Sequence, residues 1–152
     1  GEDLNYKQAV SALVVIHSPD MEFLLIERAH HPGFWQSVTG SREGEESLLA
    51  TAYREVEEET GIRAEPGAIV DHHRQQIFEI YPMWRERYAP GVTCNTEHLF
   101  SLCVPRGTAI RLAPDEHRAF RWTSVPEAAA ACFSPSNRDA ILALAGEGFE
   151  RA

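Results

Sequence analysis

The sequence has little positive charge, few cysteines and no long apolar run. Its 14 Lys and Arg residues are outnumbered by 23 Asp and Glu, which gives a formal net charge of −9. Proteins that bind a nucleic-acid backbone present basic faces, so we expect no nucleic-acid partner. Because no apolar stretch reaches membrane-spanning length and the N-terminus lacks a signal-peptide pattern, we expect no membrane partner either.

The cysteines Cys94, Cys103 and Cys132 are odd in number and lack the spacing of a metal site. They are typical of reduced thiols, which predicts a cytoplasmic protein. With 152 residues, of which 43% are hydrophobic, we expect one domain over residues 1–152 with a single sizeable core. No internal repeat or low-complexity linker is present, and nothing indicates an obligate protein partner.

The order of apolar segments predicts a mixed sheet between helices. The nearly continuous apolar run 9–17 is typical of a strand buried on both faces. A capping box, Ser124 with Glu127, opens one of the helices. Strands are expected at 9–17, 22–28, 35–39, 68–72, 75–81, 97–104 and 119–122, and helices after Glu46, after Ser124 and from Ser134 to Leu144.

The most informative segment runs from Gly40 to Ile62, GSREGEESLLATAYREVEEETGI. Glu55, Glu58 and Glu59 stand at positions i, i+3 and i+4, so on a helix their carboxylates project from one face. Like charges at this spacing repel one another, whereas Mg²⁺ prefers oxygen ligands and would bridge them to substrate phosphates. For these acids alone, a solvated acidic helix face is the ordinary alternative.

The residues around the acids favour the metal site. The segment resembles the Nudix box, G-x5-E-x7-R-E-U-x-E-E-x-G-U with U aliphatic, and meets every specified position. This resemblance implies the Nudix fold, an α+β architecture with an α/β/α sandwich around a mixed central sheet. It also implies a hydrolase that cuts nucleoside diphosphates linked to another moiety with divalent metal ions. The positions that complete the box around the acids are Gly40, Glu46, Arg54 and Gly61.

The helix that carries the acids has recognisable ends. Ser47 or a neighbouring glutamate can cap its start, and Gly61 can supply the left-handed residue that ends it. Arg54 precedes Glu58 by four residues and could also reach Glu46, which would orient the acids. An apolar stripe is expected to pack on the sheet, formed by Leu49, Ala52, Tyr53 and Val56.

Segments outside the box, 34–40, 87–93, 95–97 and 136–138, resemble the bacterial dihydroneopterin triphosphate pyrophosphohydrolase family. That family removes pyrophosphate from the pterin triphosphate of folate synthesis and has also been described as acting on dATP. The resemblance spans nearly the whole chain and implies a small-molecule triphosphate substrate. It also implies Mg²⁺ as cofactor, for which Mn²⁺ can substitute.

The same resemblance implies a substrate site. Arg28 would bind phosphate, with Lys7 as a second cation, although both could be surface cations at strand ends. Thr39 would offer a hydroxyl or backbone group, or be an ordinary strand threonine. Ser134 would donate a hydrogen bond or simply cap a helix. The pterin or purine ring would be held by Phe78, Glu79, Ile80 and Tyr81, with Glu79 accepting from ring N–H and amino groups; by alternation these four cannot all face one way.

A further metal carboxylate is expected from a loop, with Glu97 and Glu116 as candidates. We choose Glu116, because in the resembling family an acid just ahead of the late aromatic strand completes the site. Glu97 is then expected at a strand edge, and His117 on the surface, because Mg²⁺ favours oxygen donors. The expected catalytic residues and metal ligands are Glu55, Glu58, Glu59 and Glu116, with the Gly40 carbonyl as a further metal ligand.

Three alternatives remain. A non-catalytic Nudix-fold nucleotide-binding module would usually lack box carboxylates, all of which are present here. An isoprenoid diphosphate isomerase on the same fold would need an additional Cys/Glu proton-transfer pair. A (deoxy)nucleoside triphosphate pyrophosphatase preferring dATP stays open, because pterins and purines both present flat, nitrogen-rich edges.

Overall fold

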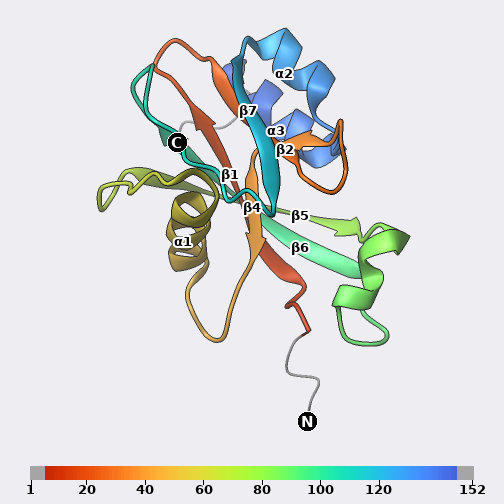
Figure 1. The fold of residues 1–152 in the computed structure, drawn as a ribbon. Helices are drawn as coiled ribbons and strands as arrows, with labels where there is room; N and C mark the ends of the chain where they lie inside the picture. Colours follow the sequence, from red (N-terminus) through yellow and green to blue (C-terminus); the bar gives the residue numbers. More distant parts are fainter. Residues whose placement is uncertain (1–5, 147–152) are drawn as a thin grey trace.

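A computed structural model describes residues 6–146, which form an α/β/α sandwich with a mixed sheet (Figure 1). The strands are β1 (Val10–His17), β2 (Phe23–Arg28), β3 (Trp35–Gln36), β4 (Val38–Ser41), β5 (Ile69–Glu79), β6 (Cys94–Cys103) and β7 (His117–Thr123). The helices are α1 (Leu48–Thr60), α2 (Val125–Ala131) and α3 (Pro135–Ala145), with a 3₁₀ helix η2 (Pro82–Arg87). The predicted fold class is confirmed.

Strand β1 lies at the centre of the sheet, as its apolar sequence predicts. It pairs in parallel with β6 along its whole length and antiparallel with β4. With β2, its neighbour in the sequence, β1 makes only a short antiparallel contact at His17 and Phe23. Strand β2 instead pairs mainly with β7, which follows much later in the chain.

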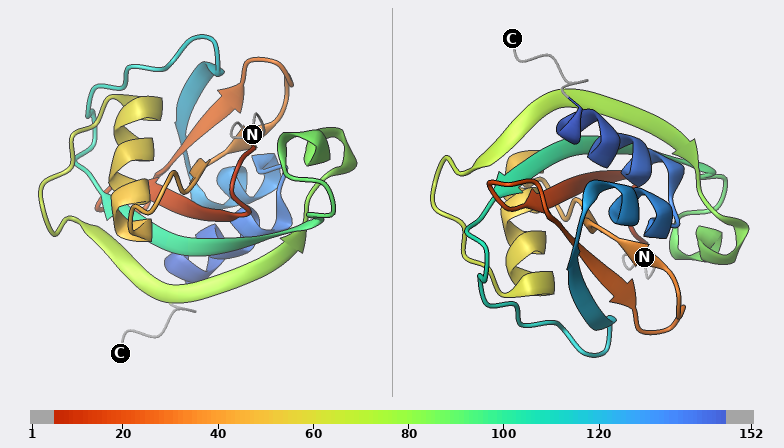
Figure 2. Two further views of the ribbon diagram at one scale, coloured as in Figure 1. Left: turned by 90° about the horizontal axis from the view of Figure 1, so that it is seen from below. Right: turned by 90° about the horizontal axis from the view of Figure 1, so that it is seen from above.

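Alternation along β1 divides the apolar side chains between two clusters. Ala12, Val14 and Ile16 pack with Ala52 and Val56 of α1. The intervening side chains face the other helical layer. Figure 2 shows α1 on one side of β1 and β6 and α3 on the other. That second cluster contains Leu13 and Val15 with Ala128 of α2 and Ala140 and Ile141 of α3.

Helix α1 has the predicted ends. The Ser47 hydroxyl accepts a hydrogen bond from the Ala50 amide at 3.0 Å, and Gly61 adopts a φ of 78°. The predicted apolar stripe is correct for Ala52 and Val56, which are buried, but wrong for Leu49, which is 42% exposed. In the first turn of α1 it is the preceding residue, Leu48, that packs against the core instead.

Strand β5 differs from the prediction of two separate strands, 68–72 and 75–81. It is one edge strand whose register with β6 shifts between Asp71 and Gln75, and His73 within the shift has a φ of 53°. The polar residues at the shift interrupt the apolar pattern, and the pairing with β6 resumes beyond them at Gln75. Helix η2, which follows, was not predicted.

No helix formed by the described residues is long and apolar enough to cross a membrane.

Phe100 tests the core on the α1 side of the sheet. It is 1% exposed, so Phe100→Ala should lower the free energy of unfolding by about 3–5 kcal/mol, because it removes buried apolar surface and leaves a cavity. Phe120→Ala is the matched control: this ring is 41% exposed, and its loss should cost less than about 1.5 kcal/mol. Urea unfolding of both variants measures the difference, and equal losses would contradict the assigned core.

Candidate active site

The box glycine and the box acids meet where α1 packs against β4. A Cβ at Gly40 would lie 2.0 Å from Cδ of Glu55, so a side chain there would displace this carboxylate. Glycine at position 40 therefore allows Glu55 to lie against the strand. Glu59, one helical turn further, is also buried, so both carboxylates lie on the buried face of the helix.

Arg54 holds the box together. Its guanidinium donates to Glu46 Oε1 at 2.5 Å, to Glu55 Oε2 at 2.8 Å and to the Ser41 carbonyl at 3.0 Å. The hydrogen bond from Arg54 is the main reason why the pKa of Glu46 falls to about 2. The prediction that Arg54 reaches Glu46 is confirmed, and the contact joins the loop before α1 to the acids on the helix.

Glu58 does not join the two buried acids. Its side chain is 57% exposed and lies 3.4 Å from the Arg54 guanidinium. On a helix Glu59 is rotated about 40° from Glu55 in one direction and Glu58 about 60° in the other, so only Glu59 turns toward the sheet with Glu55. The expectation of one shared face holds for Glu55 and Glu59, while Glu58 stands at its solvent side.

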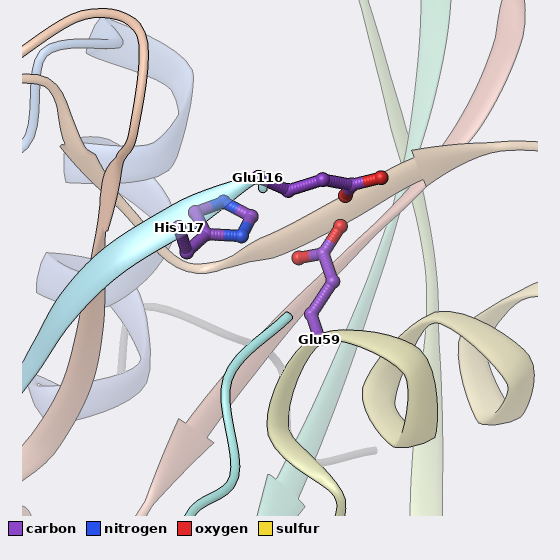
Figure 3. A group of neighbouring side chains, drawn as sticks. All are labelled: Glu59, Glu116 and His117. Carbon is purple, nitrogen blue, oxygen red and sulfur yellow. The ribbon is translucent and has the colours of Figure 1, made fainter. Parts of the chain in front are cut away.

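Glu116 reaches this site from the segment just before β7. Ligand atoms of Glu59, Glu116 and His117 all lie within 4.8 Å of one another, and Figure 3 shows the Glu59 and Glu116 carboxylates pointing toward each other. The Glu116 carbonyl accepts from the Ala29 amide at 2.9 Å, which fixes the segment beside the end of β2. Glu116 therefore lies beside Glu59, and its role as a metal ligand stays a prediction.

The expectation that His117 lies on the surface was wrong. Its side chain is buried as the first residue of β7, and burial, with Arg28 nearby, lowers its pKa to about 4. At neutral pH the ring is therefore uncharged. Its Nδ1 atom is buried without a hydrogen-bond partner in the structure.

The buried carboxylates are electrostatically unfavourable without a cation. Burial, together with the charges of Glu55 and Glu116, raises the pKa of Glu59 well above its ordinary value, and burial also raises the pKa of Glu55. Glu59 Oε1 is buried and accepts no hydrogen bond in the structure. A divalent cation would supply the missing charge and bind this oxygen, so the donor set fits a hard metal ion.

A cavity of about 400 Å³ continues from the box glycine toward α3. All the predicted substrate residues line it, namely Lys7, Arg28, Thr39, Phe78, Glu79, Ile80, Tyr81 and Ser134. Although Phe78 to Tyr81 all line the cavity, they do not face one way, as expected from alternation: Ile80 is 3% exposed, whereas the Glu79 side chain is 76% exposed.

Aromatic side chains that the sequence analysis missed form the mouth of this cavity. Trp84 of η2 stacks on Tyr81 at 5.4 Å between ring centroids, and Phe133 stands edge-on to both. The Arg28 guanidinium lies 4.4 Å from the Trp84 ring centroid and donates to Gln36 Oε1 at 2.9 Å. Trp84 lies in a 3₁₀ helix whose sequence has no hydrophobic periodicity, so sequence patterns alone did not indicate that this residue belongs to the site.

Two further expectations are refined by the contacts. Ser134 is the N-cap of α3 and accepts from the Asn137 amide, so the capping interpretation is confirmed, while substrate contact stays a prediction. Glu97 was expected at a strand edge but is buried beneath α3, where it accepts from the Ser136 hydroxyl at 2.9 Å. Among the described residues it is Glu116, not Glu97, that clusters with Glu59.

The family model described as the NUDIX domain matches residues 7–144 of the chain. The chain belongs to the Nudix family. The dihydroneopterin triphosphate diphosphatase of Escherichia coli is 46% identical over 143 residues, which cover 92% of this chain and 94% of that protein. The diphosphatase of the same name from Haemophilus influenzae is 38% identical over 91% of this chain and 88% of its own.

Solved structures agree with this membership. The structure of the E. coli dihydroneopterin triphosphate pyrophosphohydrolase superposes with a TM-score of 0.84 at 47% identity, covering 90% of this chain and 94% of that one. A Nudix hydrolase described as putative, from Listeria monocytogenes, has a TM-score of 0.75 at 20% identity over 95% of this chain and all of that chain, which shows the shared fold alone.

The chain is therefore a Nudix hydrolase, of a family whose members typically depend on divalent metal ions. The isomerase alternative loses its support, since Cys94, Cys103 and Cys132 are free and none of them lines the cavity. Burial also raises the pKa of Cys132 to about 11, which keeps this thiol protonated.

Glu59→Gln tests the buried carboxylate. The variant should keep the fold, because the amide has the same shape and removes a charge that repels Glu55 and Glu116. Turnover should fall on the order of 10²–10³-fold. In EDTA its melting temperature should equal or exceed that of the wild type, and added Mg²⁺ should raise it less.

Glu57→Gln is the matched control, since Glu57 is an exposed α1 residue paired with Arg63 at 2.9 Å. It should retain both turnover and the Mg²⁺-dependent rise in melting temperature. Near-normal turnover by a folded Glu59→Gln protein would remove Glu59 from the metal site.

Proposed function

We propose that this chain hydrolyses 7,8-dihydroneopterin triphosphate to the monophosphate and pyrophosphate, with Mg²⁺ as cofactor and Mn²⁺ able to replace it. The observation that carries the proposal is one continuous cavity, which runs from the box strand past Arg28 to an aromatic mouth. Its volume, about 400 Å³, lies in the range of small-molecule sites. The relatives named for this activity, at 46% and 38% identity, support the same substrate.

Cationic side chains suit the phosphate end of the cavity. Arg28 is held in place by Gln36 and by the Trp84 ring, so its guanidinium is oriented before a ligand binds. Burial and the neighbouring charge of Arg87 lower the pKa of Arg28, and an anionic phosphate would offset this loss of hydration. Lys7 and Thr39 line the same part of the cavity and would contact further phosphate oxygens.

The buried and loop carboxylates suit a metal site for the hydrolysis step. Glu55, Glu59 and Glu116 would hold Mg²⁺, with the Gly40 carbonyl beside Glu55 as an additional oxygen donor. When bound, the ion supplies positive charge at the phosphates and lowers the pKa of a bound water. Glu58 and Glu116 are the candidates for accepting the proton of the attacking water, because both are exposed carboxylates at the edge of this site.

The aromatic mouth suits the ring of the substrate. Phe78, Tyr81 and Trp84 offer flat apolar faces, and Ile80 is buried just after β5, the strand that carries Phe78. A pterin stacked there would direct its side chain toward Arg28, and Ser134 stands at the same opening. Glu79 is largely exposed beside Arg85, which places it at the rim.

The direct test measures pyrophosphate release from dihydroneopterin triphosphate and from dATP in Mg²⁺, with product identification by chromatography. We expect monophosphate and pyrophosphate from both, and a higher kcat/KM for the pterin. A higher kcat/KM for dATP would favour the nucleoside triphosphate alternative. If neither substrate yielded pyrophosphate, the proposed reaction would be refuted.

Glu116→Gln tests the loop ligand. The box carboxylates should still bind Mg²⁺, so the variant should need a higher Mg²⁺ concentration, and kcat should fall more than substrate affinity because the lost charge acts in the transition state. Asp115→Asn is the matched control, an exposed acid next to it whose backbone carbonyl accepts from His30. Equal Mg²⁺ titration curves for both variants would contradict this role of Glu116.

A further inference from the structure

The floor of the cavity beneath α3 carries two buried polar side chains that the phosphate and metal chemistry does not use. Asn95 and Glu97 are two residues apart in β6, so both side chains project from the α3 face of the sheet. They are 4% and 8% exposed. Both line the cavity. Buried polar groups require partners, so their hydrogen bonds indicate what a ligand would have to supply.

Both side chains present unsatisfied acceptor capacity. Asn95 donates from Nδ2 to Ser11 Oγ at 2.8 Å, which orients the amide and leaves its buried Oδ1 without a partner in the structure. Glu97 accepts from Ser136 Oγ at 2.9 Å through Oε1. A carboxylate can accept about four hydrogen bonds, so Glu97 could accept further hydrogen bonds from a ligand. Burial raises the pKa of Glu97, which shows the cost of leaving the carboxylate without them.

We propose that Glu97, with Asn95 beside it, recognises the amino-pyrimidine edge of the pterin and thereby selects the pterin over adenine. This inference rests on the proposed function. The 2-amino group and the adjacent ring N–H of a pterin are parallel donors, and they match the two oxygens of a carboxylate as a guanidinium does. The role of ring acceptor thus belongs to Glu97 rather than to Glu79, whose side chain is 76% exposed at the rim.

The position of Glu97 suits a ligand that also reaches the box. Ser11 of β1 is the register partner of Glu97 in β6 on one side and of Ser41 in β4 on the other. Two strand spacings, about 10 Å, therefore separate Glu97 from the strand that carries the box glycine. A pterin whose edge lies on Glu97 could extend its side chain across β1 toward the phosphate-binding residues.

Adenine presents a different edge to this floor. Its amino group is flanked by ring nitrogens that only accept, so one carboxylate oxygen would face a lone pair. The aromatic rings at the mouth stack on any flat base and do not make this distinction. Discrimination by a site built for hydrogen bonds can be large, because a mismatched ligand leaves buried polar groups unpaired.

Glu97→Gln tests the proposal through the ratio of kcat/KM for dihydroneopterin triphosphate to kcat/KM for dATP. The ratio should fall about 10- to 100-fold, since Gln replaces a charged acceptor for the pterin and can both donate to and accept from adenine. The loss with the pterin should come mainly from a higher KM. The matched control Glu57→Gln, an exposed residue of α1, should keep the wild-type ratio.

Other outcomes are decisive in different ways. An unchanged ratio, or an equal loss with both substrates together with a lower melting temperature, would overturn the inference and leave a structural role for Glu97. If Glu97→Gln does not fold, Ser136→Ala replaces it: loss of the hydroxyl that orients Glu97 should lower the same ratio, and an unchanged ratio would overturn the inference. Wild-type protein that cannot hydrolyse the pterin triphosphate would refute the proposed function, and this inference with it.

Discussion

The burial of two glutamates of α1 against the box strand is the constraint on which the rest of the site depends. Like charges out of water destabilise a fold unless another charge compensates them. Here Arg54 compensates Glu55 and, through Glu46, ties down the preceding loop, while Glu59 keeps an oxygen without a partner. A bound cation would relieve this residual instability.

Glycine at position 40 and the late segment before β7 follow from the same constraint. Any side chain at position 40 would occupy the space of the Glu55 carboxylate. Glu116 can complete the site only because β7 pairs with β2 and brings the preceding residue next to Glu59. The site is therefore assembled from a helix, a strand and a loop that lie far apart in the sequence.

The alternation of β1 separates two tasks. On one face, Ala12, Val14 and Ile16 pack against the helix that carries the acids. The side chains of the opposite face belong to the core beneath α3. On this second side, Ser11 and Leu13 of β1 line the cavity. The acids of α1 and the β1 residues that line the cavity therefore lie on opposite faces of the strand.

The placement of side chains could be predicted where a local pattern decides it, and could not where tertiary packing decides it. Glu55 and Glu59 could be predicted because helical spacing places them together, and Arg54 because it is one turn from Glu58. Leu49 and His117 were misplaced, since whether a side chain is covered depends on elements distant in sequence. Trp84 was missed because η2 has no hydrophobic periodicity and becomes part of the site only by lying against Tyr81 and Arg28.

By itself, the sequence determined the helix of acids, its two ends, the central strand and the Nudix family, because each of these depends on short-range spacing and residue type. The tertiary structure decided which acids are buried, that Glu116 rather than Glu97 approaches Glu59, and that Glu97 lies beneath α3. The physical reason is that burial and proximity arise from the pairing of β1, β6 and β7 and the packing of α3, which no local pattern encodes.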